Sequence, residues 1–535
     1  MVIDKNTSRF ALLTYRVEEK ISFFSNKPII SLFIIGIISI AMRLLFFEPE
    51  LPIRQDANSY FWYAMDMSIL KSLPNSPHAN DGWPMVLSTV FSIFNFNNYL
   101  DYTIIQRFTT IVISVLTIIP VYYLSRRFFS PSYSILGVAI FAFEPHLIQN
   151  SLLGLTEPLY IFLGISALSL FLSQNKKLVY FSFGLIAFTT LIRAEGIVFF
   201  VIMALLFFVF NKKNKKLIGE FLIIIIIFGA VFGLMTIIKT SSSELDDTAA
   251  LSIGRWVTTS VTTQEGGITL DNAFKGIETL TKRLAQSMVP YFALFVPFGL
   301  ILLFRNINKN KLLIITSLII YLIVSIRMLS IVSDIRLLFI LYPLFGILSV
   351  YTIQHLTQKF EFKKIFLVLI IGACLILSMY FLYSNDNSKY QNEVNYFANY
   401  MINNVKVSNN FYPESGLVYG VWASSELIFP ITSSDAKYSG PQLLDYVKDS
   451  NFEYLSKNAN SVEEYIQLAR NQNLSHLVID SNENREQYFK DIFYNEEKYS
   501  YLIKEFDSLE EGFTHYNVKI FKIDYNKFDI LFKEN

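Results

Sequence analysis

Residues 217–239 read LIGEFLIIIIIFGAVFGLMTIIK and directly follow the basic segment NKKNKK at residues 211–216. A helix needs about 20 mostly apolar residues to cross a bilayer, so this stretch predicts a membrane span. The lysines before it indicate a cytoplasmic end, because loops on that side of a membrane carry an excess of Lys and Arg. This one stretch therefore indicates both the class of the protein and the direction of the helix.

Apolar runs of this kind recur along the whole chain. We predict eleven spans, at residues 29–47, 103–124, 134–150, 152–173, 178–193, 196–210, 217–239, 286–304, 312–330, 336–356 and 365–383. Of the 535 residues 53% are hydrophobic and only 17% are charged, which is too apolar for an ordinary soluble domain. The expected fold class is a polytopic α-helical membrane protein of about eleven transmembrane helices.

Charge and cysteine content exclude several classes of function. The formal net charge of +1 offers no electrostatic basis for binding nucleic acid. Five His and the single Cys374 exclude a thiolate zinc site and a disulfide framework. Cys374 lies within an apolar run, where we expect a buried or lipid-facing side chain.

Basic loops set the predicted orientation in the membrane. Each of five follows an even-numbered span: Ser125–Arg127, Asn175–Lys177, Asn211–Lys216, Arg305–Lys311 and Gln358–Lys364. The positive-inside rule makes all five cytoplasmic, together with the N-terminal tail 1–28. The first span is long and lacks a small-residue cleavage pattern, so we do not expect a cleavable signal. Segments 48–102 and 240–285 are then outer loops of a transmembrane domain at 29–383.

The apolar segment from Trp83 to Phe94 is too short for a span. Counting it as one would reverse every later loop and break the charge rule. We therefore expect a helix that lies in the outer membrane interface.

The composition changes after about residue 384, where no spanning run remains. Strand-like pieces at 416–422, 476–480 and 517–523 alternate with helix-like stretches at 442–448, 462–470 and 486–493. Strands that alternate with helices predict a small extracytoplasmic α/β domain at 384–535. It contains no dinucleotide fingerprint, P-loop or zinc-protease motif, which favours a lid or an acceptor-binding module.

Two of the acidic residues in the first outer loop are candidates for a function. Asp56 follows the first span and precedes the aromatic run Tyr60–Tyr63. It is either a solvated carboxylate or helix cap, or a general base whose pKa is adjusted near the interface. Asp81 precedes Gly82-Trp83-Pro84 and is either a turn residue or a contact for a phosphate, a metal ion or an acceptor.

Glu144, His146 and Glu157 flank the predicted outer turn between the third and fourth spans. Carboxylates at span ends are costly when they face lipid, so they tend to face a cavity or to extend toward the interface. Glu144 and Glu157 each precede a proline, which disfavours helix at these positions and predicts broken helix ends. We expect both carboxylates to reach one outer cleft, with His146 beside them.

Arg193 and Arg336 lie in short turns on the predicted outer side, where Arg is rare. An outward Arg beside a membrane can bind a lipid phosphate through bidentate, charge-assisted hydrogen bonds. Each also has an acidic neighbour, Glu195 or Asp334, so a purely structural ion pair is the alternative. Arg255, in the long outer loop, is a weaker candidate of the same kind.

The order of these pieces resembles the GT-C superfamily of integral membrane glycosyltransferases. The motifs are an outer-loop Asp56, Gly82-Trp83-Pro84, Arg126-Arg127-Phe128-Phe129, Glu144-Pro145-His146, Thr156-Glu157-Pro158-Leu159-Tyr160, Arg193-Ala194-Glu195-Gly196 and the span that begins Asp334-Ile335-Arg336. They cover about residues 29–383. The branch with protein O-mannosyltransferases and lipid A aminoarabinose transferases is the most similar. The tail lacks a Trp-Trp-Asp-type motif, which argues against an oligosaccharyltransferase.

This resemblance implies sugar transfer from a polyprenyl- or dolichyl-phosphate donor to a protein or glycolipid acceptor at the outer face of a cell membrane. It implies that Asp56 is the general base on the acceptor and that Arg193, Arg336 and Arg255 bind the donor phosphate. Asp81, Glu144, His146 and Glu157 would line the cleft or contact the acceptor. A divalent metal is left open, because metal dependence differs within the superfamily and the acidic residues and His fix no ligand spacing.

Two functions of other classes compete with this one. A flippase or transporter of lipid-linked sugar would place its polar residues near the bilayer midplane, often with internal symmetry. Here the charged residues gather at the outer ends of spans and no internal repeat is visible, which favours surface chemistry. A non-catalytic scaffold would tolerate replacement of both Asp56 and Arg336.

Overall fold

A computed structural model of the protein describes residues 27–242 and 270–532, apart from residues 52, 54, 72–80, 95, 97–98, 359, 361, 405–458, 471–475 and 482–485. The chain forms two compact units. The first comprises 1–47, 64–95 and 104–385, and the second comprises 48–63, 96–103 and 386–535. Helix α3 (Gln55–Leu70) and helix α5 (Tyr99–Leu116) contribute to both units.

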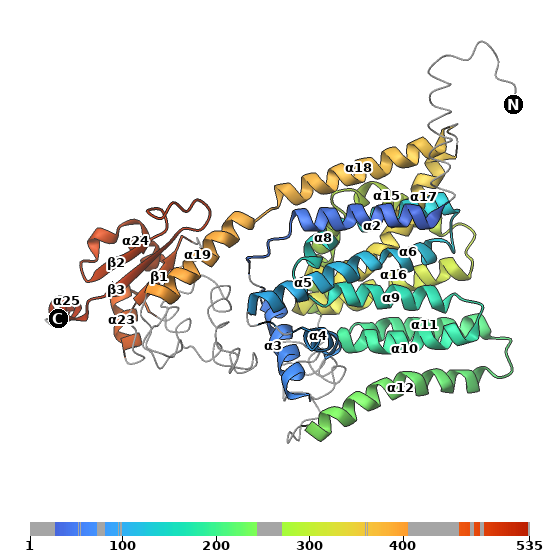
Figure 1. Ribbon diagram of the computed structural model, residues 1–535, viewed down its shortest axis with the longest axis horizontal. Coiled ribbons are helices and arrows are strands. Elements are labelled where there is room, and N and C mark those ends of the chain that lie inside the picture. The colour runs from blue at the N-terminus through green and yellow to red at the C-terminus, as the bar shows by residue number, and fades with distance from the viewer. Residues whose placement is uncertain are drawn as a thin grey trace, which may run out of the picture. The chain divides into compact units, whose positions relative to one another are not determined.

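The first unit is a bundle of helices (Figure 1). Besides α5 it contains α2 (Pro28–Leu45), α4 (Gly82–Phe91), α6 (Ile118–Ser125), α7 (Pro131–Ala142), α8 (Pro145–Ser151), α9 (Glu157–Phe171), α10 (Lys176–Ile192), α11 (Gly196–Asn211), α12 (Leu217–Ser242), α14 (Leu270–Ser287), α15 (Phe292–Leu303), α16 (Lys309–Ile331), the 3-10 helix η2 (Ile335–Leu341), α17 (Tyr342–Thr357) and α18 (Lys363–Ser384). Figure 1 shows α2, α6, α9, α10 and α12 as successive neighbours, each packed on the next.

Every one of the eleven predicted runs is helical. Among the described residues, six stretches are long and apolar enough to cross a membrane: Pro28–Leu45, Leu100–Ser125, Leu217–Met235, Lys309–Ile331, Ile335–Thr357 and Lys363–Phe397. The bent pair of α14 and α15 makes a seventh if it is one broken span. The remaining runs fall on the shorter helices α7, α9, α10 and α11. The prediction of a polytopic helical membrane protein is confirmed.

One predicted span is sharply bent. The run 286–304 is divided between the end of α14 and the whole of α15, and these two helices are bent by 111°. Pro290 lies in the turn between them. A proline has no N–H to donate and disfavours helix in the residue before it, so the helical hydrogen bonding stops here.

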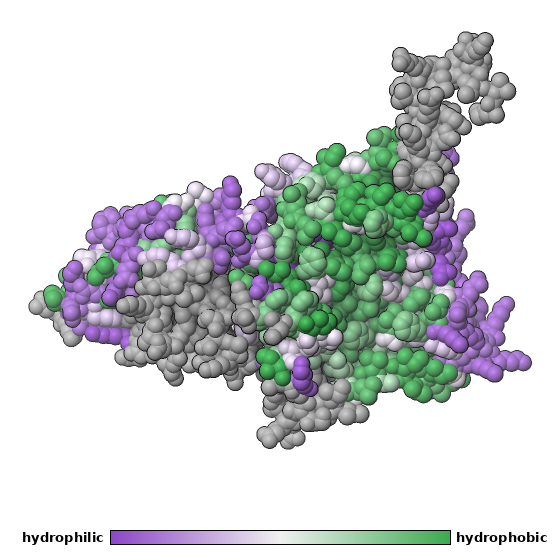
Figure 2. Space-filling model, viewed as in Figure 1, coloured by the Kyte–Doolittle hydropathy of each residue, from purple (hydrophilic) through white to green (hydrophobic). Residues whose placement is uncertain are grey.

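Four contacts place the five basic loops at one end of the bundle, which we call the lysine end. Asn310 Nδ2 donates to Arg127 O (3.0 Å), Lys309 Nζ donates to Phe210 O (3.4 Å), Lys176 Nζ binds Glu220 Oε1 (2.5 Å) and the Tyr133 and Thr357 hydroxyls lie 2.7 Å apart. Figure 2 shows hydrophilic side chains at this end and an apolar belt over the helices beside it. The loops thus share one end, as the charge rule requires.

Asparagines begin two helices at the lysine end. The side chain of Asn175 accepts a hydrogen bond from Lys177 N at 3.0 Å, and that of Asn308 accepts one from Lys311 N at 2.9 Å. Both are N-caps, which satisfy a backbone donor that the first helical turn cannot pair. In these loops the Asn side chains therefore cap the helices, and the Lys side chains supply the positive charge.

The second unit contains a three-stranded antiparallel sheet with strand order β1-β3-β2. Its strands are β1 (His476–Asp480), β2 (Leu502–Asp507) and β3 (Val518–Ile523), and its helices are α19 (Ser388–Asn404), α23 (Val462–Arg470), α24 (Gln487–Tyr494), the 3-10 helix η5 (Glu496–Lys498) and α25 (Tyr525–Phe532). Apolar side chains of α23, α24 and α25 form one core with β1 and β3. Phe397 of α19 packs on Phe506 of β2, with ring centroids 5.1 Å apart.

The sequence predicted several of these elements closely. Helix α23 and strand β1 have the predicted bounds, β3 begins one residue later than predicted, and α24 is shifted by one residue at both ends. The predicted strand at 416–422 and the predicted helix at 442–448 lie outside the described residues. Strand β2 and helix α25 were not predicted.

Candidate functional site

Three turns at the end of the bundle opposite the lysine end bring together two arginines and one buried carboxylate. Arg193 Nη1 lies 2.5 Å from Glu157 Oε1, and Arg336 Nη1 lies 3.8 Å from the same oxygen. Glu157 begins α9, Arg193 follows α10, and Arg336 lies in the first turn of η2. The sequence had placed each of these residues in a separate turn, and the fold assembles them. With Glu195 and Asp334 they form what we call the arginine cluster.

Arg193 is enclosed by acceptors. Its Nη2 lies 3.0 Å from Glu195 Oε1, and its Nη1 also donates to Thr156 Oγ1 at 3.4 Å. The guanidinium carbon lies 6.0 Å from the ring centroid of Tyr160. Only 15% of the side chain is exposed. Arg193 therefore holds Glu157 and Glu195 in place and offers little surface to a ligand.

Arg336 is held differently and is more open. Asp334 caps η2 by accepting Arg336 N at 2.9 Å, and its other oxygen accepts Arg336 Nε at 2.6 Å. The expected pair with Asp334 is thus present, and it orients the arginine side chain. With 27% of that side chain exposed, Arg336 is the more accessible of the two arginines.

Glu144 and His146 form a separate pair at the start of α8. One oxygen of Glu144 lies 2.8 Å from His146 Nδ1, and the other accepts Leu147 N at 2.8 Å as the cap of α8. Glu144 is fully buried, and the ring of His146 lies 4.9 Å from that of Phe381. Glu144 and Glu157 do not bind each other. Asn150, on α8 between them, donates to Glu157 Oε2 at 3.3 Å.

Helix α4 packs directly on the turn that carries Arg193. A Cβ at Gly82 would lie 2.9 Å from Ile192 N, so only glycine permits this approach. Trp83 is fully buried and donates from Nε1 to Gly154 O at 3.2 Å. Asp81 precedes this helix, is buried, and does not cap it through its side chain. The segment predicted to lie in the interface is therefore a helix that supports the arginine cluster.

Asp56 lies in the first turn of α3 and is exposed to solvent, and it belongs to the second unit. The same helix carries Asp66, which the sequence analysis did not select. Asp66 is half-buried, and this burial raises its pKa to about 6. Arg255 lies outside the described residues.

Arg43 is a buried cation that the sequence reasoning missed. It lies in α2 and is 1% exposed. Its Nε donates to Ser151 Oγ at 3.0 Å and its Nη2 to Ser114 Oγ at 2.9 Å, so it joins α2 to α8 and α5. An arginine near the end of an apolar run ordinarily extends to the interface. No local signal distinguishes that position from a buried one.

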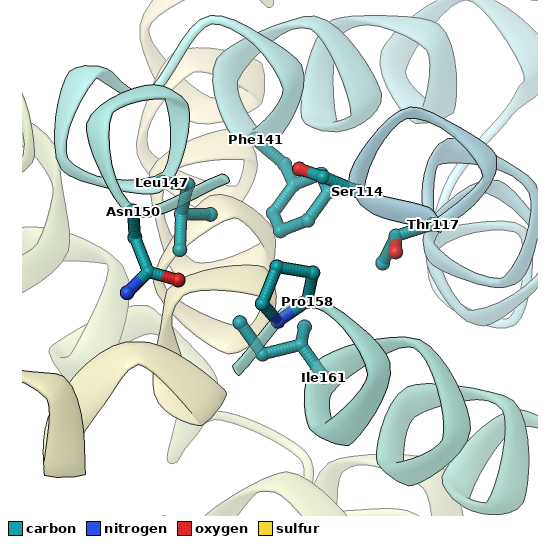
Figure 3. Close-up of a pocket in the computed structure, with 7 residues that line it drawn as sticks. All are labelled: Ser114, Thr117, Phe141, Leu147, Asn150, Pro158 and Ile161. Atoms are coloured by element: carbon teal, nitrogen blue, oxygen red, sulfur yellow. The ribbon is translucent and has the colours of Figure 1, made fainter. Parts of the chain in front are cut away.

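A small pocket of about 10 Å³ has lining residues that contact Arg43 and Glu157. It is lined by Ser114, Thr117, Phe141, Leu147, Asn150, Pro158 and Ile161 (Figure 3). Figure 3 shows Asn150 and Leu147 on one side and Ser114 and Thr117 on the other. Ser114 also binds Arg43, and Asn150 also binds Glu157, so the pocket walls connect both groups.

Metal-binding residues do not gather at any one place in the part of the chain that the structure describes. Among those residues no group of three or more His, Cys, Asp or Glu side chains could hold a metal ion. Glu144 and His146 are a pair of suitable ligand types.

Comparison with solved structures identifies proteins of the same fold. ArnT from Cupriavidus metallidurans in the apo state has a TM-score of 0.54 at 9% identity, over 92% of this chain and 98% of that one. ArnT bound to undecaprenyl phosphate gives 0.53 at 9% identity, over 92% and 97%. The Archaeoglobus fulgidus oligosaccharyltransferase in complex with Zn and sulfate gives 0.51 at 14% identity, over 84% and 68%.

No protein-family model matches the sequence, and no curated protein matches it. The similarity is therefore one of structure, and it extends over nearly the whole chain in the case of ArnT. ArnT and the oligosaccharyltransferase are both GT-C membrane glycosyltransferases. This protein accordingly has the fold of the GT-C superfamily of integral membrane glycosyltransferases, as the order of its sequence motifs predicted.

Proposed function

We propose that this protein is a glycosyltransferase that transfers a sugar from a polyprenyl- or dolichyl-phosphate carrier to an acceptor at the outer face of a cell membrane. The observation that carries the proposal is the arginine cluster, in which two guanidinium groups converge on buried Glu157 at one end of a GT-C bundle. The neighbour ArnT was solved with undecaprenyl phosphate, which supports a polyprenyl carrier.

The proposed orientation follows from charge. All five basic loops share the lysine end, and Lys and Arg collect on the cytoplasmic side of membranes. The arginine cluster then lies at the outer surface, where the phosphate of a lipid carrier resides while its chain stays in the bilayer. Residues 384–535 lie on the outer side in this proposal, as a lid or acceptor-binding module.

Arg336 is the proposed contact for the donor phosphate. As the bond between the anomeric carbon and the phosphate oxygen breaks, its electron pair and negative charge pass to the phosphate. A fixed guanidinium lowers the energy of that charge. Asp334 orients Arg336 through two hydrogen bonds, while Arg193, enclosed by Glu157 and Glu195, positions the cluster.

Asp56 is the proposed general base. An acceptor hydroxyl attacks the anomeric carbon and its proton passes to the Asp56 carboxylate, so direct displacement inverts the anomeric centre. The support is its place after the first span and its exposure in the first turn of α3. Asp81, Glu144, His146 and Glu157 remain proposed cleft or acceptor residues.

A divalent metal is compatible with this fold, since the A. fulgidus oligosaccharyltransferase was solved with Zn. In this chain Glu144 and His146 would supply one oxygen and one nitrogen ligand, and the described residues complete no set around them. No step of the proposed reaction depends on a metal.

The test is sugar transfer by the purified protein in nanodiscs, with a panel of radiolabelled polyprenyl-phosphate sugars and membrane extract as acceptor. We expect Arg336→Ala to lower the transfer rate at least ~100-fold, the usual cost of losing one group that stabilises a developing charge. We expect a loss of about the same size for Asp56→Asn.

The matched control is Lys504→Gln, which removes a charge from the sheet of the second unit. It should transfer sugar at the wild-type rate. Wild-type activity in folded Arg336→Ala would refute the phosphate role, and wild-type activity in folded Asp56→Asn would remove that residue from the mechanism. Asp66→Asn, made in parallel, reports whether the second carboxylate of α3 contributes.

A further inference from the structure

Helix α14 runs alongside the outer end of α16. A Cβ at Gly276 would lie 2.1 Å from Ile326 O, so the two backbones touch at this glycine. Seven residues later, Arg283 binds Ser333, which is seven residues beyond Ile326. The two contacts are seven residues apart in both segments and occur in the same order. Helix α14 therefore runs in the same direction as the end of α16. Arg283 is therefore held at the level where α16 ends.

Arg283 binds Ser333 through several hydrogen bonds. Its Nη2 donates to Ser333 O at 2.8 Å and to Ser333 Oγ at 2.9 Å, and its Nε donates to the same hydroxyl at 3.1 Å. Its Nη1 donates to Gln286 Oε1 at 2.8 Å, which fixes the guanidinium on its own helix. Because the planar guanidinium of Arg283 is bound on both sides, it limits the movement of Ser333.

Ser333 immediately precedes the residues that orient Arg336. Asp334 follows it and accepts both the backbone N and the side-chain Nε of Arg336. The turn itself is open, since Val332 and Ser333 are exposed. The hydrogen bonds from Arg283 therefore attach this exposed turn to a different helix, α14.

We infer that Arg283 is a positioning residue for Arg336. It holds the turn Ser333–Asp334 from outside, so that Asp334 presents the Arg336 guanidinium toward Glu157 and the donor phosphate. This inference rests on the proposed role of Arg336 in binding the donor. It assigns a task in donor recognition to α14, a helix that contributes no residue to the arginine cluster.

Loss of Arg283 should weaken the contact between Arg336 and the donor phosphate. The turn gains freedom, so Arg336 is less often placed to bind the phosphate and to stabilise the charge that develops on it. A hydrogen bond to a charged group contributes about 1.5 kcal/mol or more, which corresponds to roughly tenfold in binding. We therefore expect Arg283→Gln to raise the donor KM, to lower kcat as well, and to lower kcat/KM for the donor about tenfold.

The experiment measures donor KM, kcat and thermal unfolding for Arg283→Gln, Ser333→Ala and the double variant in nanodiscs. Lys282→Gln is the control, because Lys282 is the neighbouring cation on α14 and pairs with Glu278. Ser333→Ala removes only the hydroxyl acceptor, so it should raise KM less than Arg283→Gln. The double variant should be no worse than Arg283→Gln alone, since both changes break one connection.

Three results would overturn the inference. An unchanged kcat/KM for the donor in Arg283→Gln would exclude a positioning role. Additive effects in the double variant would mean that Arg283 binds the phosphate itself. If Arg283→Gln does not fold, an unchanged donor KM in Ser333→Ala would overturn the inference. Arg336→Ala separates the two proposals: if it leaves donor KM unchanged, the proposed phosphate site fails, and with it the role of Arg283.

Discussion

The arginine cluster and a lysine network in the second unit contain similar charges in different surroundings. We define the lysine network as Lys504, Lys519, Glu496, Asp507 and Glu510. Lys504 Nζ lies 2.8 Å from Glu496 Oε1 and 2.9 Å from Glu510 Oε1, so its ion pairs are as short as those of the cluster. Distance alone does not separate a candidate site from ordinary surface electrostatics.

The burial of the shared carboxylate and the origin of the residues do separate them. Glu157, which two arginines share, is 1% exposed, whereas 30% of the side chain of Glu496, which two lysines share, faces solvent. The network joins two adjacent strands and the loops beside them, as alternating charges on a sheet readily do. The cluster joins three helix turns far apart in sequence. Buried charges are expensive in a membrane bundle, so their convergence there indicates a function.

The largest expected effect in this comparison is that of Glu157→Gln. It removes the carboxylate shared by Arg193 and Arg336, and breaking a buried pair from one side costs about 3 kcal/mol. We expect a clearly lower unfolding temperature in detergent by differential scanning fluorimetry. Glu496→Gln, which also removes a carboxylate shared by two cations, is the matched control and should cost less than about 1 kcal/mol. Equal losses would mean that burial does not distinguish the two groups.

A smaller effect is expected from salt. Raising the ionic strength from about 0.1 M to about 1 M shortens the Debye length from about 10 Å to about 3 Å. The difference in unfolding temperature between wild type and Lys504→Gln should shrink over this range. The difference for Glu157→Gln should persist, because buried pairs are screened much less. If the difference for Glu157→Gln also shrank with salt, the arginine cluster would be exposed to solvent. Burial would then not distinguish it from the lysine network.

The sequence predicted the members of the cluster but not their connections. Arg193 and Arg336 were selected as outward arginines that could bind a lipid phosphate, and Glu157 as a span-end carboxylate that tends to face a cavity. Each also had a structural alternative: a local ion pair with Glu195 or Asp334 for the arginines, and extension to the interface for Glu157. The packing of α9, α10 and α16 decides which turns come into contact. This packing cannot be inferred from a local sequence pattern. For the same reason the sequence treated the two arginines as equals, although Arg193 is enclosed and Arg336 is open.

The same limit explains the elements that were missed. Strand β2 reads LIKEFD and contains a bulge between Lys504 and Phe506, so its apolar residues do not alternate as a regular strand would. Helix α14 is amphipathic and precedes Pro290, and in the sequence it merges with the predicted span at 286–304. Strand β1 and helix α23 were predicted with their observed bounds, since β1 is a short continuous apolar run and the apolar residues of α23 recur at helical spacing.

The smallest expected effect concerns a carboxylate in the second unit that binds mainly backbone N–H groups, with His515 Nδ1 3.5 Å from one of its oxygens. Glu393 of α19 accepts Thr514 N at 2.9 Å, His515 N at 2.8 Å and Tyr516 N at 2.7 Å. Burial opposes its ionisation, but these backbone donors outweigh that effect and lower the pKa of Glu393. Its attachment of α19 to the loop before β3 is therefore stronger while it is ionised.

A lowered folded pKa means that this stabilisation is complete above the usual pKa of a glutamate and is lost as the pH falls through the folded value. Hydrogen exchange of the full-length protein should show protected amides at residues 514–516 at neutral pH, and Glu393→Gln should reduce that protection by up to tenfold. The difference between the two proteins should narrow toward acidic pH, once wild-type Glu393 is protonated. Glu505→Gln, which removes a carboxylate from β2 near His476, is the control and should leave these amides protected. If the amides of Glu393→Gln exchanged like those of wild type at neutral pH, the attachment of α19 would rest on the packing of Phe397 against Phe506. Charge in the second unit would then be dispensable for its fold, unlike charge in the arginine cluster.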